Sequence, residues 1–223
     1  LVQVHAEELF GIVLAQIFNE GSPVLYGPVP AAANMRNMAY LAGAPETGMM
    51  NAGAVQLSNY IDVPIYSDAG ETDSKIPDTQ AGIEGALNIL QVGLAGGNYI
   101  HHAAGMMESM LSVAYEKFVI DNDVIGMATR VLRGIDVSDE SLALDVIKDV
   151  GPGNNFLTEE HTIKNSRSEE FYQPKVIDRE DRNIWQENGA RDTRERARER
   201  TREILKVSQD NLLSENVDRK IRQ

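Results

Sequence analysis

Short apolar runs recur along the first part of the chain, and a helical pattern follows each of them. The runs begin near residues 23, 63 and 98, so successive units are 35 to 40 residues long. Alternation of strand and helix at this spacing is typical of parallel α/β folds, and the length fits the units of a (β/α)8 TIM barrel. Three strands cannot close a barrel of eight. The expected fold is therefore α/β, either as part of a TIM barrel or as an open sheet.

The helical segments between these runs have apolar faces. Residues 5–19 predict a largely buried helix, residues 45–61 predict a second helix, and residues 79–94 predict a third. The stripe expected to be buried in the third helix contains Ile83, Ala86, Leu87, Leu90 and Leu94. Further along, the β-branched residues of 119–124 could start as a strand, whereas residues 125–132 have the helical period.

Charge is distributed unevenly over the 223 residues, whose formal net charge is -13. Residues 1–163 contain 6 Lys and Arg against 21 Asp and Glu, whereas residues 164–223 contain 15 against 13. The acidic body argues against nucleic acid as a partner and suits a cationic ligand, although solubility explains it equally well. The sequence has no cysteine and no apolar run of eighteen residues. We therefore expect no thiolate metal site, no membrane span and a cytoplasmic protein.

A turn cluster at residues 151–155 divides the sequence. We expect residues 1–153 to form the βα units and residues 154–223 to form a helical, densely charged tail. The longest helix of the tail should cover residues 192–207. Such a tail is expected to pack on the barrel or on a neighbouring subunit. The exposed strand edges of a half-barrel predict either a homo-oligomer or a piece of a longer chain.

Charged and aromatic residues gather where the second strand ends, within residues 63–82. Ligands of parallel α/β proteins bind at the carboxyl ends of strands, so this loop is a candidate binding site; the alternative is a solvated surface loop. Tyrosine rings and carboxylates can hold a quaternary ammonium group through cation–π and charge attraction, although tyrosines of the core and rim would look the same. The candidate substrate-binding residues are Tyr26, Tyr66, Glu71, Asp73, Lys75, Gln80, His101 and Glu108. No catalytic residue is assigned.

Two of these candidates also have a structural interpretation. Lys75 lies between Asp73 and Asp78, an arrangement that more often pins a loop than binds a ligand. His101 and His102 would point to opposite faces of a regular strand. They could then not both ligate one metal ion, so no metal site is expected. One of the two could face a barrel interior; the alternative is a core histidine with a hydrogen-bonded partner.

A series of segments that occur in the same order in a known protein family indicates the function more specifically. The matching segments are residues 43–46, 73–84 (DSKIPDTQAGIE), 151–153, 156–157, 161–162 and 167–169, then Pro174, residues 178–179, Trp185, and residues 189–190 and 195–197. With these residues the chain resembles the trimethylamine:corrinoid methyltransferase superfamily over most of residues 20–205. Members of that superfamily are TIM barrels about twice as long as this chain, and the resemblance is to their C-terminal half.

The resemblance implies transfer of a methyl group from a quaternary or tertiary methylamine to the Co(I) of a partner corrinoid protein. The chain itself would bind no cofactor, because that partner supplies the cobalamin. Founding members carry a pyrrolysine near the positions of Ile65 and Tyr66, whereas this sequence has ordinary residues throughout. It therefore resembles the non-pyrrolysine branch, which favours a betaine-like substrate over trimethylamine. The alternatives are a non-catalytic module that binds quaternary amines and a fragment that mediates assembly.

Overall fold

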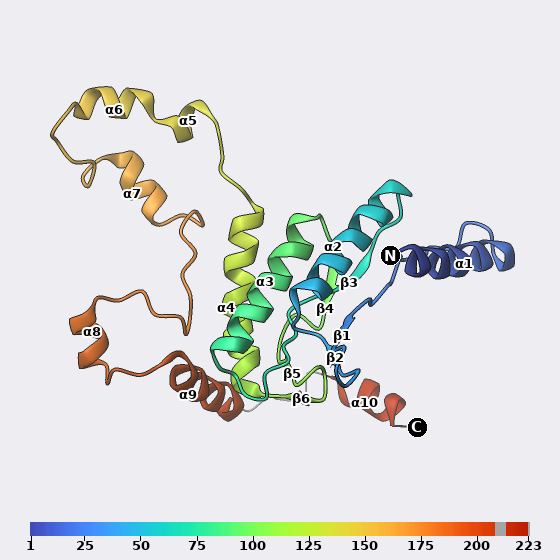
Figure 1. Cartoon of the computed structure of the whole chain (residues 1–223). Coiled ribbons are helices and arrows are strands. Elements are labelled where there is room, and N and C mark those ends of the chain that lie inside the picture. Colours follow the sequence, from blue (N-terminus) through green and yellow to red (C-terminus); the bar gives the residue numbers. More distant parts are fainter. Residues whose placement is uncertain (208–212, 223) are drawn as a thin grey trace.

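The computed structural model describes residues 1–207 and 213–222 (Figure 1). Helices account for most of the regular structure, and the strands are short. The helices are α1 (Val2–Phe18), α2 (Pro45–Tyr60), α3 (Thr79–Leu94), α4 (Tyr115–Leu132), α5 (Asp139–Leu142), α6 (Leu144–Val150), α7 (Glu160–Ser166), α8 (Arg182–Glu187), α9 (Thr193–Lys206) and α10 (Glu215–Ile221). The strands are β1 (Ala32–Ala33), β2 (Tyr40–Leu41), β3 (Tyr66–Asp68), β4 (Tyr99–His101), β5 (Met106–Met107) and β6 (Ser112–Val113).

Neighbouring parallel segments form the frame of the fold. Tyr26 pairs with Ile65 in a parallel bridge, and β3 pairs with β4 in parallel, with Asp68 opposite His101. The crossovers between these segments contain α2 and α3. The strands expected near residues 63 and 98 are confirmed, and the one near residue 23 is reduced to the bridge. The strands of the described residues close no barrel, so the TIM-barrel architecture stays a prediction.

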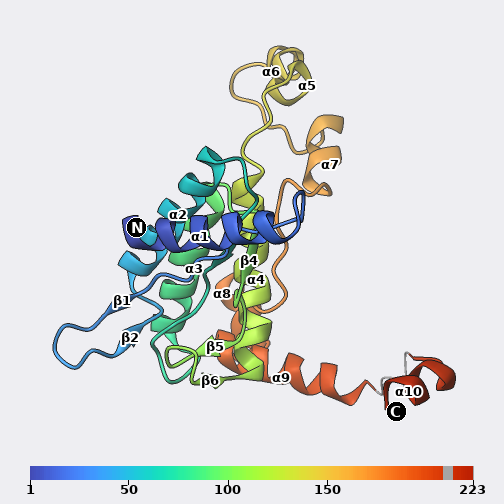
Figure 2. The same ribbon diagram turned by 90° about the vertical axis from the view of Figure 1, so that its right-hand side faces the viewer.

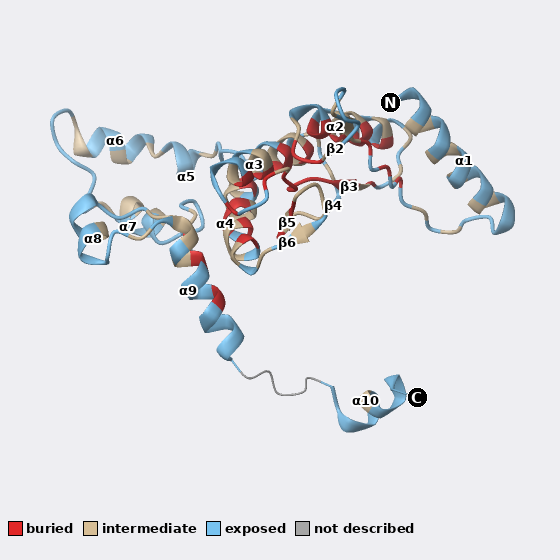
Figure 3. Cartoon of the chain, turned by 60° about the horizontal axis from the view of Figure 1, so that its bottom comes forward, coloured by how far each residue is buried: buried red, intermediate tan, exposed pale blue. Residues whose placement is uncertain are grey.

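The helices α2, α3 and α4 pack next to one another beside these strands, as Figures 1 and 2 show. Burial is concentrated in this layer and in β3 (Figure 3). The central core contains Tyr26, Ala54, Val55, Ile65, Ala69, Ile89, Val92, Val124 and Ala128. The core thus lies between the parallel segments and the three helices, which fixes the carboxyl ends of β3 and β4.

The limits of α3 agree with the sequence, but its buried face agrees only in part. Asp78 begins the helix by accepting a hydrogen bond from the Ala81 N–H at 3.1 Å. Of the expected stripe, Ile83 and Leu94 are 62% and 66% exposed. The buried residues of α3 are Ala81, Gly85, Asn88, Ile89 and Val92. Ala86 and Leu90 of the expected stripe do pack on the core, whereas Ile83, Leu87 and Leu94 are exposed. The expected face is only partly correct because α3 lies between α2 and α4, so the helices packed beside it decide which side is buried.

Helix α1 forms at the expected place, but the expectation that it is largely buried is wrong. It contains no buried residue, and Phe10 and Phe18 are 69% and 82% exposed. On the side toward the body, Ile12 packs on the core and His5 meets the Tyr26 hydroxyl at 3.1 Å. Figure 1 shows the helix projecting from the layer of α2, α3 and α4. Part of the apolar surface of α1 therefore makes no contact with the described part of the chain.

Helix α4 is continuous, so the strand expected at residues 119–124 is wrong. Lys117, Asp121 and Asp123 are buried along it, and Lys117 forms an ion pair with Asp121 one helical turn away. Packing against α3 and α9 and this i,i+4 pair outweigh the strand preference of the β-branched residues. The helical period expected for residues 125–132 is confirmed.

Beyond α4 the chain leaves the helical layer and later returns to it (Figure 1). The excursion contains α5 and α6, which have no buried residue. The return is fixed at Asp123, a fully buried carboxylate. It accepts hydrogen bonds from the backbone N–H groups of residues 175–177 at 2.7–3.1 Å and from the Tyr172 hydroxyl at 3.1 Å. The Asp123 side chain of α4 thus holds the returning chain, and Arg130 of α4 adds bonds to Glu170.

The long charged helix expected at residues 192–207 is confirmed as α9. Asp192 caps it and accepts a hydrogen bond from the Glu195 N–H at 2.7 Å. The helix packs on α4 through the buried residues Ala197 and Thr201. The division of the chain at residue 153 stays a prediction.

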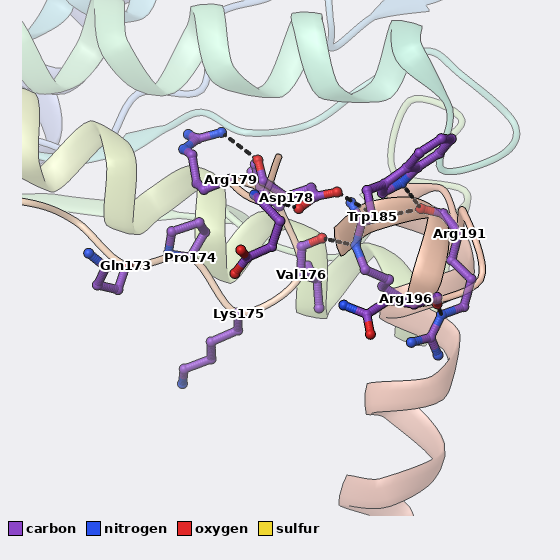
Figure 4. Close-up of a pocket in the computed structure, with 12 residues that line it drawn as sticks. Gln173, Pro174, Lys175, Val176, Asp178, Arg179, Trp185, Arg191 and Arg196 are labelled. Atoms are coloured by element: carbon purple, nitrogen blue, oxygen red, sulfur yellow. Dashed lines mark hydrogen bonds and ion pairs between the residues drawn. The ribbon is translucent and has the colours of Figure 1, made fainter. Parts of the chain in front are cut away.

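A pocket of about 250 Å³ lies in the returning tail (Figure 4). Arg196 crosses it and donates hydrogen bonds to the carbonyl oxygens of Val176 and Arg191. The indole N–H of Trp185 donates to the same Arg191 carbonyl at 3.1 Å. The guanidinium of Arg196 is thus engaged with the main chain, and the contacts of this pocket hold the segments of the tail together.

We predict that Asp123→Asn lowers the free energy of unfolding by about 2–3 kcal/mol, because an amide cannot accept from all the N–H groups that face the carboxylate. Urea denaturation measures this loss. Limited proteolysis should also cut residues 167–190 faster in the variant. Asp149→Ala, at an exposed position of α6, is the control and should change neither measurement. Equal stability of Asp123→Asn and the wild type would contradict the anchoring role.

Candidate functional site

Acidic and imidazole side chains meet at the carboxyl ends of β3 and β4. We call Asp68, Glu71, His101 and His102 the strand-end cluster. The Nδ1 atom of His102 lies 3.3 Å from Asp68 Oδ1 and 3.4 Å from Glu71 Oε1. The Nε2 atom of His101 lies 4.0 Å from the same Asp68 oxygen. Asp68 and Glu71 are both 2% exposed, so their charges are shielded from water by the protein.

Local backbone geometry brings these residues together. The loop after β3 turns at Gly70, whose φ is +102°, and the Cβ of any other residue there would lie 2.7 Å from the backbone of Ala103. The strand β4 ends at His101, and His102 follows with a φ of +55°. This left-handed residue breaks the alternation of a regular strand. The expectation that His101 and His102 point to opposite faces therefore fails, and both approach Asp68.

Aromatic rings line one side of the cluster. The ring of Tyr66 stacks on that of His101 with centroids 4.1 Å apart and an interplanar angle of 13°. Tyr66 also contacts Tyr99, with centroids 4.9 Å apart. The hydroxyl of Tyr40 is buried, and burial followed by the charge of Glu71 raises its pKa above the ordinary value. Carboxylates and electron-rich ring faces thus adjoin, which is a combination that attracts cations.

Burial dominates the electrostatics of the cluster. It raises the pKa of Asp68, and the two histidines oppose this shift. Burial and the neighbouring charge of Asp68 raise the pKa of Glu71 to about 8. Burial lowers the pKa of His101, which favours the neutral imidazole. Without a bound cation, Glu71 therefore keeps its proton near neutral pH, and a cation placed beside it would favour the ionised carboxylate.

A buried ion pair on α4 holds both loops of the site. Lys117 is 1% exposed, and its Nζ lies 2.5 Å from Asp121 Oδ2 and 3.2 Å from the Gly70 carbonyl oxygen. The same Asp121 oxygen accepts a hydrogen bond from the Gly105 N–H at 2.7 Å. Gly70 belongs to the loop after β3, and Gly105 follows β4. The pair, which we call the α4 clamp, therefore sets the distance between the two halves of the strand-end cluster.

Asp73 lies at the edge of the cluster and is held by a separate network. Its N–H donates to Glu84 at 2.8 Å, and its Oδ1 accepts from the Ser109 hydroxyl at 2.7 Å. The charge of Asp73 contributes to the raised pKa of Glu71, after burial and Asp68. Asp73 thus adds a third carboxylate to the electrostatics of the site.

The structure brings together Tyr66, Glu71 and His101 of the candidate residues, with Asp73 at the rim. Tyr26 lies in the core and bonds to His5, so it is not part of the cluster. The other candidates lie outside the cluster as well, and they are Lys75, Gln80 and Glu108. Whether any of them touches substrate stays a prediction.

The contacts of these outlying residues are local. The ammonium group of exposed Lys75 donates to the Asp73 carbonyl oxygen at 2.7 Å instead of pairing with a carboxylate. Exposed Gln80 donates to Glu84 at 2.8 Å. Glu108 is half-buried with a φ of +52°, and its N–H donates to the Ser74 carbonyl oxygen at 2.9 Å. These contacts shape the loops around the site.

The candidate residues did not include Asp68, His102 or Tyr40, and the sequence did not reveal the α4 clamp. Asp68 carried a usable signal, since it ends the apolar strand directly. Lys117 and Asp121 have the spacing of a helical pair, and a helix through residues 119–124 would have revealed it. Tyr40 fitted a core residue as well as a pocket-lining residue, because the strand to which it belongs has only two residues and fixes no alternating pattern.

By its fold and its site, the chain is an α/β protein with a cation-attracting cluster at the ends of its parallel strands. The family model Trimethylamine methyltransferase (MTTB) matches residues 1–223. The chain belongs to this family. This member of the family therefore has a parallel βα arrangement with an acidic, aromatic site at the strand ends.

Curated relatives agree with the family assignment. The chain is 36% identical over 217 residues to the glycine betaine methyltransferase of Desulfitobacterium hafniense strain Y51, covering 97% of this chain and 45% of that protein. It is 42% identical over 205 residues to the trimethylamine methyltransferase MttB of D. hafniense strain DSM 10664 / DCB-2, covering 92% and 41%. For MttB of Methanosarcina thermophila the identity is 37% over 211 residues, covering 94% and 43%. The chain thus spans less than half the length of these relatives.

Across the described ranges, none of the helices combines the length and the apolar character needed to cross a lipid bilayer.

We predict that Lys117→Met lowers the free energy of unfolding by about 3–5 kcal/mol, because it leaves the Asp121 carboxylate buried without its partner. The double variant Lys117→Met/Asp121→Asn should recover at least half of that loss. The surface pair Lys164–Glu140 supplies the control, and Lys164→Met should leave the urea midpoint unchanged. A loss in Lys117→Met no larger than in Lys164→Met would contradict the clamp.

Proposed function

We propose that this chain is the C-terminal part of a corrinoid-dependent methyltransferase built on a TIM barrel. The enzyme would move a methyl group from a quaternary or tertiary methylamine, such as a betaine, to the Co(I) of a corrinoid protein. Membership of the trimethylamine methyltransferase family supports the reaction class. Relatives named for glycine betaine and for trimethylamine support a methylated amine as substrate. A cytoplasmic location and a homo-oligomeric state complete the proposal.

The chemistry of the reaction limits what the protein must supply. The corrinoid, carried by its own protein, would supply the cobalt nucleophile that accepts the methyl group. As the C–N bond breaks, the bonding electrons stay on nitrogen, so a quaternary substrate leaves as a neutral amine without needing a proton. The protein then has to position the methyl group and hold the cationic nitrogen.

The strand-end cluster suits the second task. Two unit charges about 5 Å apart attract by roughly 3 kcal/mol at an effective dielectric constant of about 20. Carboxylates of the cluster and Asp73 would provide this attraction. The stacked rings of Tyr66 and His101, with the tilted ring of Tyr99 beside them, would provide a surface for N-methyl groups. The single observation that carries the proposal is this junction of buried carboxylates and stacked rings at the ends of two parallel strands.

The test uses the intact protein with reduced corrinoid and a panel of methylated amines, and it follows methylcobalamin by its absorbance. We predict that Tyr66→Ala and Glu71→Gln each reduce kcat/KM at least tenfold, because each removes part of the cation site. Tyr66→Phe keeps the ring and should recover most of the loss seen in Tyr66→Ala. Tyr60→Ala is the control, since Tyr60 is 86% exposed on α2.

Other outcomes distinguish the alternatives. Saturable binding of a quaternary amine without methyl transfer would favour a non-catalytic binding module. Absence of both binding and transfer with every amine of the panel would overturn the proposed function. A loss of activity in Tyr60→Ala equal to that in Tyr66→Ala would overturn the assignment of the site.

A further inference from the structure

Buried polar atoms without partners are concentrated in the strand-end cluster. Within residues 1–207 and 213–222, neither ring nitrogen of His101 has a hydrogen-bond partner, and Asp68 Oδ2 and Glu71 Oε1 have none apart from the bond that a protonated Glu71 can share with Asp68. The side chain of Asp68 is 2% exposed and that of His101 is 9% exposed. Folded proteins pair such groups with protein atoms, water or a ligand, because an unpaired buried polar group is costly. The cluster therefore has the donor and acceptor atoms of a ligand site.

The spacing of these atoms fits one small ion. One ligand atom from each of Asp68, His101 and His102 lies within 4.8 Å of the other two. The individual separations are 3.3 Å from Asp68 Oδ1 to His102 Nδ1 and 4.0 Å from Asp68 Oδ1 to His101 Nε2. Glu71 Oε1 lies 3.4 Å from His102 Nδ1. Ligands about 2.0–2.1 Å from a tetrahedral zinc ion are roughly 3.3 Å apart, so small side-chain rotations would close the set.

The types of ligand atom narrow the identity of the ion. Two imidazole nitrogens with carboxylate oxygens favour zinc and related transition metals, whereas calcium and magnesium prefer oxygen ligands alone. A quaternary ammonium group has neither an N–H to donate nor an empty orbital. It can offset the charge of Asp68 and Glu71, but it cannot bond to their free oxygens or to His101. A metal ion can do both.

We propose that Asp68, Glu71, His101 and His102 bind one divalent transition-metal ion, with zinc as the ion to be tested. His101 coordinates through Nε2 and His102 through Nδ1. The stacked ring of Tyr66 fixes the plane of the His101 imidazole, and the α4 clamp holds the loops that carry the ligands. This site goes beyond the proposed methyl transfer and does not rest on it.

A bound divalent ion is compatible with a cationic substrate nearby. The ion would balance the charges of Asp68 and Glu71, and Asp73 at the rim would leave one net negative charge. An ammonium group would still be attracted to that edge and to the ring of Tyr99. With the ion bound, Asp73 and the rings of Tyr66 and Tyr99 would hold the ammonium group, and without it the carboxylates of Asp68 and Glu71 would add to that attraction.

The experiment measures zinc retained by the full chain after incubation with zinc chloride and exhaustive dialysis. We expect about one zinc ion per chain in the wild type. Asp68→Asn, His101→Ala and His102→Ala should each lower the zinc affinity at least tenfold. The matched control is His161→Ala, because His161 is half-buried on α7, far along the chain from the cluster, and bonds only to the Glu140 carbonyl oxygen among the described contacts. It should retain zinc like the wild type.

A second measurement distinguishes loss of metal binding from misfolding of a variant. Cobalt(II) added to the wild-type chain should give the intense visible absorption of a tetrahedral site with nitrogen ligands, and His102→Ala should lose it while its far-ultraviolet circular dichroism stays unchanged. No zinc retention in the wild type, or equal retention in His101→Ala and His161→Ala, would overturn the proposal. Neither readout involves methyl transfer, so the proposed function and the metal site can fail separately.

Discussion

The ion pair between Lys117 and Asp121 is the interaction on which the site depends. It is buried on α4, yet its contacts reach Gly70 after β3 and Gly105 after β4. The strands themselves pair over only a few residues and could not fix the loops beyond their ends. A helix that packs behind the strands therefore determines how the loops meet. The helices therefore stabilise the fold, and the side chains of the loops remain free to bind ligands.

Elements with strong local signals could be predicted from the sequence. Asp78 and the apolar pattern after it define α3, and Asp192 defines α9, since capping residues act through neighbouring backbone N–H groups. Which face of each helix is buried was harder to predict from the sequence. Ile83 and Leu94 have the character of core residues but are exposed, and α4 is a helix despite its β-branched residues. Both results depend on which helix packs beside which, and that information is not local.

The candidate site divides in the same way. Tyr66, Glu71 and His101 were predictable because residues at the ends of neighbouring parallel strands must lie close together. Tyr26 was misplaced because its strand is only a bridge, and its ring points into the core. His102 could not be predicted to join His101, because its orientation follows from one left-handed backbone angle. Similarity to known proteins identifies the family, whereas the geometry of the strand ends explains why these particular side chains meet.

The anchoring of the tail at Asp123 has a consequence for how this chain can vary. The carboxylate bonds to the main-chain amides of residues 175–177, which every amino acid except proline provides. The bonds from Asp123 to residues 175–177 are therefore independent of the side chains at those three positions. The segment between α4 and Glu170 is an excursion tethered at both ends, because Arg130 of α4 bonds to Glu170, and its length is not constrained by these anchors. Insertions, deletions or a grafted domain in this segment should leave the helical layer and the strand-end cluster in place.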